Sequence, residues 1–326
     1  MRCKYMSQQQ QGITNKEAYT ESNASYQKVL NQLAALCEKN LTSDGEVDTA
    51  IPFITLYKSS KETPLLPGIL TPSICLILQG EKNIHINQNI IQYNSGDYVA
   101  SLIDFPVSAQ VIGASEDKPY IGLRVEFTAQ EIFSVMMDAK INVNSKDNNL
   151  NMAAFIGKSN FELLDLLMRL LRLLDKPDSI PFLSTLIKRE IIYHLLTGDY
   201  GQLFLQQAFI DSNIDSIGRA ITLIKENISE PFTVEGLAKL CNMSVSGLHH
   251  KFKATLNMGP LQYQKNLRLQ EARRLLVSGS MSVGDVAIKV GYESYSQFNR
   301  EYRRLFGLPP LQDIKEVRIN TKMNFM

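Results

Sequence analysis

Between residues 51 and 127 the chain alternates short apolar runs with turn-forming residues. The turn signals are Gly80, Asn87–Asn89, Ser95–Asp97 and Gly113. The apolar runs are Pro52–Tyr57, Ile74–Leu78, Asn83–Ile86, Tyr98–Ile103, Val107–Ile112 and Tyr120–Phe127. Short strands at this spacing are typical of an antiparallel sandwich or a small barrel. In the last run the apolar residues from Ile121 to Phe127 alternate with Arg124 and Glu126, so the two sets lie on opposite faces of a strand.

A leucine-rich helix is expected after residue 159. Residues 161–175 carry leucine on more than one face, and such a helix needs two partners. We expect the barrel to be one partner and a second subunit the other; alternatively, this helix and the next only close the core of one subunit. The next helix is predicted from Pro181 to Gly198, because proline favours a helix N-terminus and glycine follows a C-terminus. Residues 159–162 predict a capping box with Ser159 as the N-cap.

Residues 216–310 contain an internal repeat of two helix-turn-helix units. The copies are Thr233–Thr255 and Ser282–Leu305. We expect each of their four helices to begin after a capping residue: Thr233, Ser244, Ser282 and Ser294. Six pairs of residues correspond at nearly fixed offsets, the second copy having one extra residue in its turn. These pairs are Ala238 with Ala287, Asn242 with Gly291, Leu248 with Phe298, Phe252 with Tyr302, Asn257 with Gly307, and Pro260 with Pro310.

The second helix of each copy presents a polar stripe to solvent. Hydrogen-bonding groups lie toward its N-terminal end and cations toward its C-terminal end. This order suits contacts of the N-terminal part with base edges and of the C-terminal part with phosphates. The candidate base-reading residues are Ser246, His249, His250, Ser296, Gln297, Asn299 and Arg300. The candidate phosphate-binding residues are Lys251, Lys253, Arg303 and Arg304. The alternative is an ordinary solvated helix face, but two matched stripes in a repeated motif favour DNA.

A continuous helix is predicted between the copies, over residues 261–278. At 1.5 Å per residue it is about 27 Å long. A strut of this length can hold two helices about one DNA turn, roughly 34 Å, apart on one face of the duplex. One chain would then read two successive major-groove segments.

Charge divides the chain in the same way as the motifs. The 326 residues carry a net charge of +1, yet residues 231–310 hold 11 Lys and Arg against 5 Asp and Glu. A basic C-terminal part beside an acidic N-terminal part suggests a polyanion-binding module attached to another domain.

Several classes of protein are disfavoured. No run of about 18 apolar residues predicts a membrane span, and the polar N-terminus lacks a signal-peptide core. The four cysteines are Cys3, Cys37, Cys75 and Cys241. They share no CxxC spacing, which fits reduced thiols in a cytoplasm rather than zinc or disulfides. His85 is the one histidine of the barrel segment, so we expect neither a metal nor another cofactor. Cys75 is a candidate electrophile sensor, or else an ordinary buried strand cysteine.

The repeat resembles the DNA-binding domain of the AraC/XylS family of bacterial transcription regulators. The resemblance rests on MSVSGLHHKFKATLNMGPLQYQKNLRLQEARRLL and VAIKVGYESYSQFNREYRRLFGLPP. The upstream segments IPFITLYKSS, PSICLILQGEKNIHI and PYIGLRVEF resemble the AraC-type N-terminal domain of one subgroup. This resemblance implies a cupin-like effector or dimerisation domain and promoter DNA as a partner. Two departures are Asn257, where the family usually has glycine, and the His249–His250 pair, where relatives carry longer side chains.

We therefore predict an α+β protein with an N-terminal antiparallel, cupin-like β-barrel and flanking helices, followed by an all-α unit of two helix-turn-helix motifs. The expected divisions are a flexible tail (1–25), the barrel domain (26–200), a linker (201–215), the DNA-binding domain (216–310) and a C-terminal tail (311–326). The expected function is sequence-specific regulation of bacterial promoters, modulated by a small molecule of unknown identity. RNA polymerase and a second copy, joined through helices at 159–198, are further candidate partners; a membrane is not. The competing functions are an enzyme that uses the barrel and an architectural DNA-binding protein without an effector.

Overall fold

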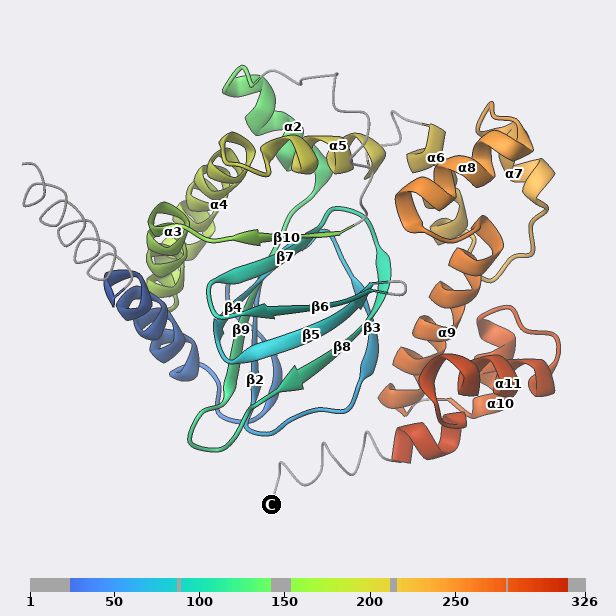
Figure 1. Ribbon diagram of the computed structural model, residues 1–326, viewed down its shortest axis with the longest axis horizontal. Helices are drawn as coiled ribbons and strands as arrows, with labels where there is room; N and C mark the ends of the chain where they lie inside the picture. The colour runs from blue at the N-terminus through green and yellow to red at the C-terminus, as the bar shows by residue number, and fades with distance from the viewer. Residues whose placement is uncertain (1–23, 87–88, 142–153, 212–215, 280, 316–326) are drawn as a thin grey trace, which may run out of the picture.

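The computed structural model describes residues 24–86, 89–141, 154–211, 216–279 and 281–315. A β-barrel flanked by helices lies beside a smaller, all-helical C-terminal unit (Figure 1). The predicted α+β class and the predicted order of the two units are confirmed.

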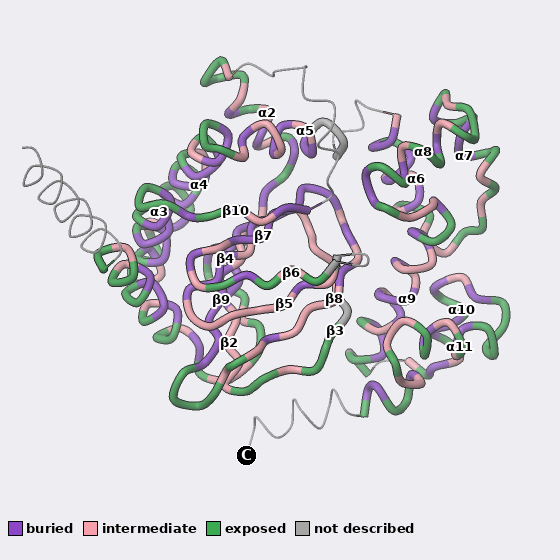
Figure 2. Tube along the Cα trace, in the orientation of Figure 1, coloured by how far each residue is buried: buried purple, intermediate pink, exposed green. Residues whose placement is uncertain are grey.

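Two antiparallel sheets form the barrel. The first has the strand order β1-β2-β9-β4-β7-β10, and the second has the order β3-β8-β5-β6. The strands of the first sheet are β1 (Gly45–Asp48), β2 (Ile54–Ser59), β9 (Tyr120–Glu126), β4 (Ser73–Gln79), β7 (Asp97–Ser101) and β10 (Phe155–Lys158). Those of the second are β3 (Leu66–Leu70), β8 (Phe105–Ile112), β5 (Glu81–Ile86) and β6 (Asn89–Asn94). The central strands β4, β7 and β9 are the most buried (Figure 2).

All six predicted strand segments are strands in the structure. Four further strands, β1, β3, β6 and β10, carry weaker signals in the sequence. In β3, for example, Pro67 and Gly68 interrupt the apolar run, yet the strand pairs with β8 from Leu66 to Leu70. Cross-strand hydrogen bonds can stabilise a segment whose own residues disfavour an extended strand.

Helices cover the outer face of the six-stranded sheet. They are a helix over residues 24–38, α2 (Ala129–Asp138), α3 (Phe161–Leu171), α4 (Ile180–Thr197) and α5 (Gly201–Asp211). Leucines of α3 and isoleucines of α4 share one core with Ile121, Leu123 and Val125 of β9. The apolar face predicted for the last strand therefore packs against the helices.

The predicted capping box at Ser159 is wrong. Asn160 is the N-cap of α3, and its side chain accepts a hydrogen bond from the backbone N–H of Leu163. The Ser159 hydroxyl instead lies within hydrogen-bonding distance of the Tyr26 hydroxyl and the Gly96 carbonyl. Asn and Ser are both good N-caps, and these distant partners decide which of the two serves.

Two expected boundaries differ from the structure. We expected a linker at 201–215, but residues 201–211 form α5, whose Phe204 and Leu205 are buried in the core of the barrel unit. We expected a tail from residue 311, but Asp313 and Ile314 are buried against the helical unit. The remainder of both segments, and residues 1–23 of the expected N-terminal tail, lie outside the described residues.

The C-terminal unit consists of α6 (Ser216–Glu226), α7 (Val234–Leu240), α8 (Val245–Leu256), α9 (Pro260–Ser278), α10 (Val283–Lys289) and α11 (Tyr295–Phe306). The long helix α9 packs its first half against the core of the first copy and its second half against that of the second. Tyr263 and Leu267 belong to the first core, and Leu269 and Leu276 to the second.

The barrel also contacts the helical unit directly. The Lys225 ammonium of α6 lies 2.6 Å from a carboxylate oxygen of Asp104, and the Tyr263 hydroxyl donates to the Asp104 carbonyl at 2.9 Å. Gln270 of α9 donates to the Gly68 carbonyl of β3 at 3.3 Å. Within the ranges that the structure describes, no helix is long and apolar enough to cross a membrane.

Candidate nucleic-acid interface and barrel cavity

The first helix-turn-helix copy folds as its sequence predicts. Thr233 caps α7 by accepting from the N–H of Gly236, and Ser244 caps α8 by accepting from that of Gly247. Asn242 turns the chain between the two helices with a φ of 54°. Asn257 ends α8 in the left-handed conformation, as expected at this departure from the family pattern.

The second copy repeats this geometry. Ser282 and Ser294 cap α10 and α11, and Gly291 forms the turn with a φ of 87°. The Ser294 hydroxyl accepts from the Gln297 N–H, as expected of an N-cap, while the Gln297 amide donates to Glu301 at 3.4 Å.

The inward stripes of the two copies match. At corresponding positions, each copy buries an alanine on its first helix and two large residues on its second. They are Ala238, Leu248 and Phe252 in the first copy and Ala287, Phe298 and Tyr302 in the second. With these faces buried, the opposite faces of α8 and α11 point to solvent.

Most of the candidate DNA-binding side chains are exposed on those outer faces. The exposed ones are Ser246, His249, His250, Lys253, Ser296, Gln297, Arg300, Arg303 and Arg304. Asn299 is half-buried. The structure brings these groups onto two helix faces with their hydrogen-bonding and cationic ends in the predicted order.

Lys251 differs from the other cationic candidates. It is half-buried, and its ammonium donates to the Ser216 hydroxyl at 2.9 Å. Ser216 is the first residue of α6, so this hydrogen bond joins α8, the second helix of the first copy, to α6.

Arg268, in the middle of α9, was not among the sequence candidates. Its guanidinium donates to the carbonyls of Ile228, Ser229 and Gly291 at 2.7, 2.9 and 2.9 Å. One side chain thus joins the segment before α7 to the turn of the second copy. The sequence shows only an arginine inside a predicted helix. Its bridging role could not be predicted, because its three acceptors are distant in the chain.

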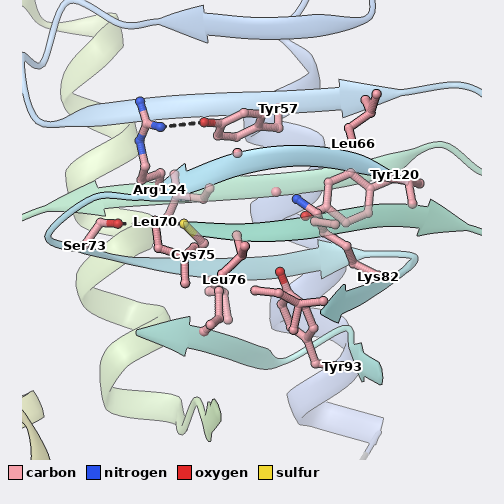
Figure 3. A pocket seen from close by; sticks show the side chains of 18 of the residues that line it. Tyr57, Leu66, Leu70, Ser73, Cys75, Leu76, Lys82, Tyr93, Tyr120 and Arg124 are labelled. Atoms are coloured by element: carbon pink, nitrogen blue, oxygen red, sulfur yellow. Dashed lines mark hydrogen bonds between the residues drawn. The ribbon is translucent and has the colours of Figure 1, made fainter. Parts of the chain in front are cut away.

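A cavity of about 250 Å³ lies inside the barrel (Figure 3). Apolar side chains from both sheets line most of it: Leu66, Ile69, Leu70, Leu76, Ile84, Val99, Val107 and Val111. Its polar groups include Tyr57, Lys82, Tyr93, Tyr120 and Arg124, with Cys75 among them. Arg124, on the polar face of β9, therefore lines the cavity, which the alternation of residues alone could not show.

Arg124 is held by several partners. It donates to the Tyr57 hydroxyl at 2.7 Å and to the Thr55 hydroxyl at 3.1 Å, and its guanidinium lies 2.8 Å from Glu46 and 3.2 Å from Glu126. The two carboxylates more than compensate the single positive charge of this arginine.

Cys75 faces the same cavity, 3.9 Å from the Ser73 hydroxyl (Figure 3). Burial raises the pKa of its thiol, although Lys82 opposes that shift. A raised pKa lowers the thiolate fraction, so burial works against the reactivity that an electrophile sensor needs. His85 of β5 does not line this cavity. Among the residues that the structure places, no group of three or more His, Cys, Asp or Glu is arranged to hold a metal ion.

Two protein families match the chain in succession. The AraC-type transcriptional regulator N-terminus matches residues 50–203, and a helix-turn-helix domain matches residues 237–316. The chain belongs to the AraC/XylS family. The first matched region corresponds to the barrel unit, and the second corresponds to the repeated motif.

Curated relatives support the same assignment. The AraC/XylS chain is 29% identical to the transcriptional regulator ArgR of Pseudomonas aeruginosa over 149 residues, 46% of this chain and 45% of ArgR. It is 24% identical to the transcriptional activator RhaS of Escherichia coli over 163 residues, 49% of this chain and 56% of RhaS. The chain thus spans about half the length of these relatives.

Solved structures share the fold. A crystal structure of ToxT from Vibrio cholerae bound to an unsaturated fatty acid matches this chain with a TM-score of 0.58 at 10% sequence identity. That match covers 84% of this chain and 96% of ToxT. The apo form of a ToxT variant gives a TM-score of 0.57, also at 10% identity, over 83% of this chain and 98% of the variant. The barrel and the repeated motif therefore occur together in both proteins.

Proposed function

We propose that this chain is a sequence-specific DNA-binding regulator of bacterial promoters whose DNA binding responds to a small molecule in the barrel cavity. The observation that carries the proposal is the matched pair of exposed polar stripes on α8 and α11. A helix of this kind fits the major groove, where side chains can reach base edges and flanking phosphates.

The long helix supports reading of two groove segments by one chain. The 19 residues of α9 span about 28 Å. Arg268 fixes the second copy to the segment that precedes the first, so the two stripes are held by a braced connection.

Residue roles follow from position on each stripe. Ser246, His249, His250, Ser296, Gln297, Asn299 and Arg300 are proposed to read bases. Lys253, Arg303 and Arg304 are proposed to contact phosphates. Lys251 is proposed for the same role, which would require its ammonium to exchange the Ser216 hydroxyl for a phosphate oxygen.

The barrel cavity is the proposed effector site. ToxT has been crystallised with an unsaturated fatty acid, and the shared fold makes a ligand in this chain a reasonable expectation. Strand β3 lines the cavity with Ile69 and Leu70, and its Gly68 carbonyl accepts from Gln270 of α9. A ligand that displaces β3 would therefore also displace α9, the helix between the two motifs.

A second copy is the proposed partner of α4. Phe182, Leu186 and Tyr193 lie on one face of this helix and are 70, 49 and 49% exposed. Contiguous exposed apolar residues mark interaction surfaces, and an isologous pairing of this helix would bury them. RNA polymerase is a further proposed partner, because a promoter regulator acts on its recruitment or progress.

An enzyme is the less favoured function. It would need a nucleophile and a base together, and of Cys75 and His85 only the cysteine lines the cavity. An architectural DNA-binding protein would leave the cavity without a role.

Selection of bound fragments from the source genome, at near-physiological salt, tests the proposal. The full-length protein should enrich a few intergenic fragments, and Arg300→Ala should lose that enrichment. Uniform, salt-sensitive binding would favour the architectural role. Failure to bind any fragment would contradict a DNA-binding function.

A further inference from the structure

We propose that Glu301 is a positioning residue for DNA recognition: its carboxylate holds the amide of Gln297 in the orientation that reads adenine. The inference rests on the proposed function, in which Gln297 faces the bases of the second groove segment. It adds the base that this side chain selects and the residue that makes the selection.

The Glu301 carboxylate of α11 is held by two other parts of the helical unit. The hydroxyl of Tyr292, between α10 and α11, donates to its Oε2 at 2.9 Å, and the Lys265 ammonium of α9 lies 3.3 Å from its Oε1. The helices α9 and α11 pack against each other (Figure 1). The Glu301 side chain is only 14% exposed, and Tyr292 is buried. These contacts fix the position of the carboxylate.

The Glu301 carboxyl is ionised at neutral pH. Burial acts to raise its pKa, but the hydrogen bonds that it accepts outweigh burial and hold the pKa below its ordinary value. An ionised carboxylate has acceptors and no donor. A side chain that bonds to it must therefore present a donor.

Gln297 meets this requirement with its NH2 group. Its Nε2 donates to Glu301 Oε1 at 3.4 Å, from one turn earlier on the same helix. The reversed amide would bring two oxygens together, so the carboxylate excludes that orientation. One of the two N–H groups binds Glu301, which leaves the other N–H and the carbonyl oxygen for DNA. Gln297 itself is exposed, as a base-reading residue must be.

An amide oriented in this way matches adenine. In the major groove adenine presents an amino donor beside an acceptor nitrogen, so the carbonyl can accept from the first while the N–H donates to the second. Guanine presents two acceptors, one of which would face the carbonyl oxygen. Cytosine offers only an amino donor and thymine only an acceptor, so neither engages both groups of the amide.

The first motif lacks this pair of residues. Counting from the matched core residues, Gly247 occupies the position of Gln297, and Lys251 occupies that of Glu301. Glycine has no side chain that could read a base edge. The effect is therefore confined to the groove segment that the second motif reads, and the segment that the first motif reads serves as an internal control.

Selection from a random library of duplex DNA by the full-length chain tests the inference. Titration of the selected site, with each of the four base pairs placed in turn at the affected position, then measures the base preference. The variants are Glu301→Ala, Gln297→Ala, the double variant, and Glu301→Gln, which keeps the size of the side chain. The matched control is Glu293→Ala, because it removes the same charge from an exposed residue of the same motif. It measures how far the lost charge alone strengthens binding to any DNA.

We expect the natural chain to prefer adenine at one position of the second segment by about fivefold or more, the lower end for a bidentate amide contact. Gln297→Ala should abolish this preference, and either change at Glu301 should reduce it to less than about twofold. The double variant should behave as Gln297→Ala does, because Glu301 acts on this base pair only through the amide. Preferences in the first segment should stay the same in every variant, which shows that the variants fold.

Four results would each overturn the inference. They are a natural chain without an adenine preference in the second segment, retention of that preference by Gln297→Ala, its retention by both Glu301 variants, and a loss of preference in both segments alike. The last result would make Glu301 a structural residue only. Failure to enrich any sequence would overturn the proposed function and this inference together, whereas an enriched site with unchanged preferences in every variant would overturn the inference alone.

Discussion

The guanidinium of Arg268 donates a hydrogen bond to the carbonyl of Gly291 across 23 positions of sequence, at 2.9 Å. Two further hydrogen bonds from the same group reach Ile228 and Ser229. The turn of the second motif is thereby fastened to the segment that precedes the first. If both motifs read DNA, this contact sets the angle between them.

Arg268→Ala should destabilise the helical unit by about 1–3 kcal/mol, because three carbonyls lose their charged donor. It should also weaken binding to a two-segment site more than to a site with a single segment. Urea unfolding and gel-shift titration measure the two effects. Arg274→Ala, on the same helix, removes an exposed pair with Glu271 and should change stability by less than about 1 kcal/mol. If both variants lost the same free energy of unfolding, Arg268 would not hold the two motifs together.

Gly291→Ala and Gly307→Ala should differ sharply, although both positions have a φ of 82–87°. A Cβ at residue 291 would overlap the carbonyl oxygen of Ser229, whereas a Cβ at residue 307 would meet nothing within 4 Å. We expect about 1–2 kcal/mol from backbone strain alone at Gly307 and a larger loss at Gly291. Comparison of the two urea midpoints checks this order. Similar costs would mean that the turn is free to move away from Ser229.

Arg300→Ala should reduce affinity for a selected site by about 1–3 kcal/mol while leaving binding to random DNA nearly unchanged, if this arginine reads a guanine. Lys253→Ala or Arg304→Ala should weaken binding to all DNA alike and make the salt dependence shallower by about one unit of slope. Titrations at several salt concentrations separate the two patterns. A uniform loss with Arg300→Ala would make it a phosphate contact.

The Asp104–Lys225 ion pair should couple the barrel to the helical unit. A double-mutant cycle with Asp104→Asn and Lys225→Met should give a coupling energy of about 1 kcal/mol, because both side chains are partly buried. The same cycle at Lys39 and Asp175, which are 60 and 55% exposed, should give a value near zero. The free energy of unfolding in urea is the quantity measured. Absence of coupling at the first pair would mean that the two units do not depend on this contact.

Some features could be read from neighbouring residues alone. The four helices of the repeated motif begin after Thr233, Ser244, Ser282 and Ser294 as predicted, because an N-cap bonds a backbone N–H only three residues away. The turns at Asn242 and Gly291 follow from the tolerance of these residue types for positive φ. The six strands with clear apolar runs could also be predicted from neighbouring residues.

Other features depended on which distant residues meet. Asn160 caps α3 because Tyr26 and Gly96 engage Ser159, and residues 201–211 are helical where a linker was expected because the barrel core takes up Phe204 and Leu205. Nothing within a few residues of these positions carries that information.

The cavity is the clearest case of this division. Alternation along the chain placed Arg124 on the face opposite Ile121 and Leu123, but it could not say whether that face meets water or the inside of a barrel. Closure of the two sheets turned Arg124 and Lys82 inward and set Glu46 and Glu126 beside Arg124. The sequence by itself determined the family, the repeated motif and its exposed stripes, since these rest on local periodicity and capping. The tertiary structure alone decided the enclosed site, since burial and charge balance are properties of residues brought together from separate strands.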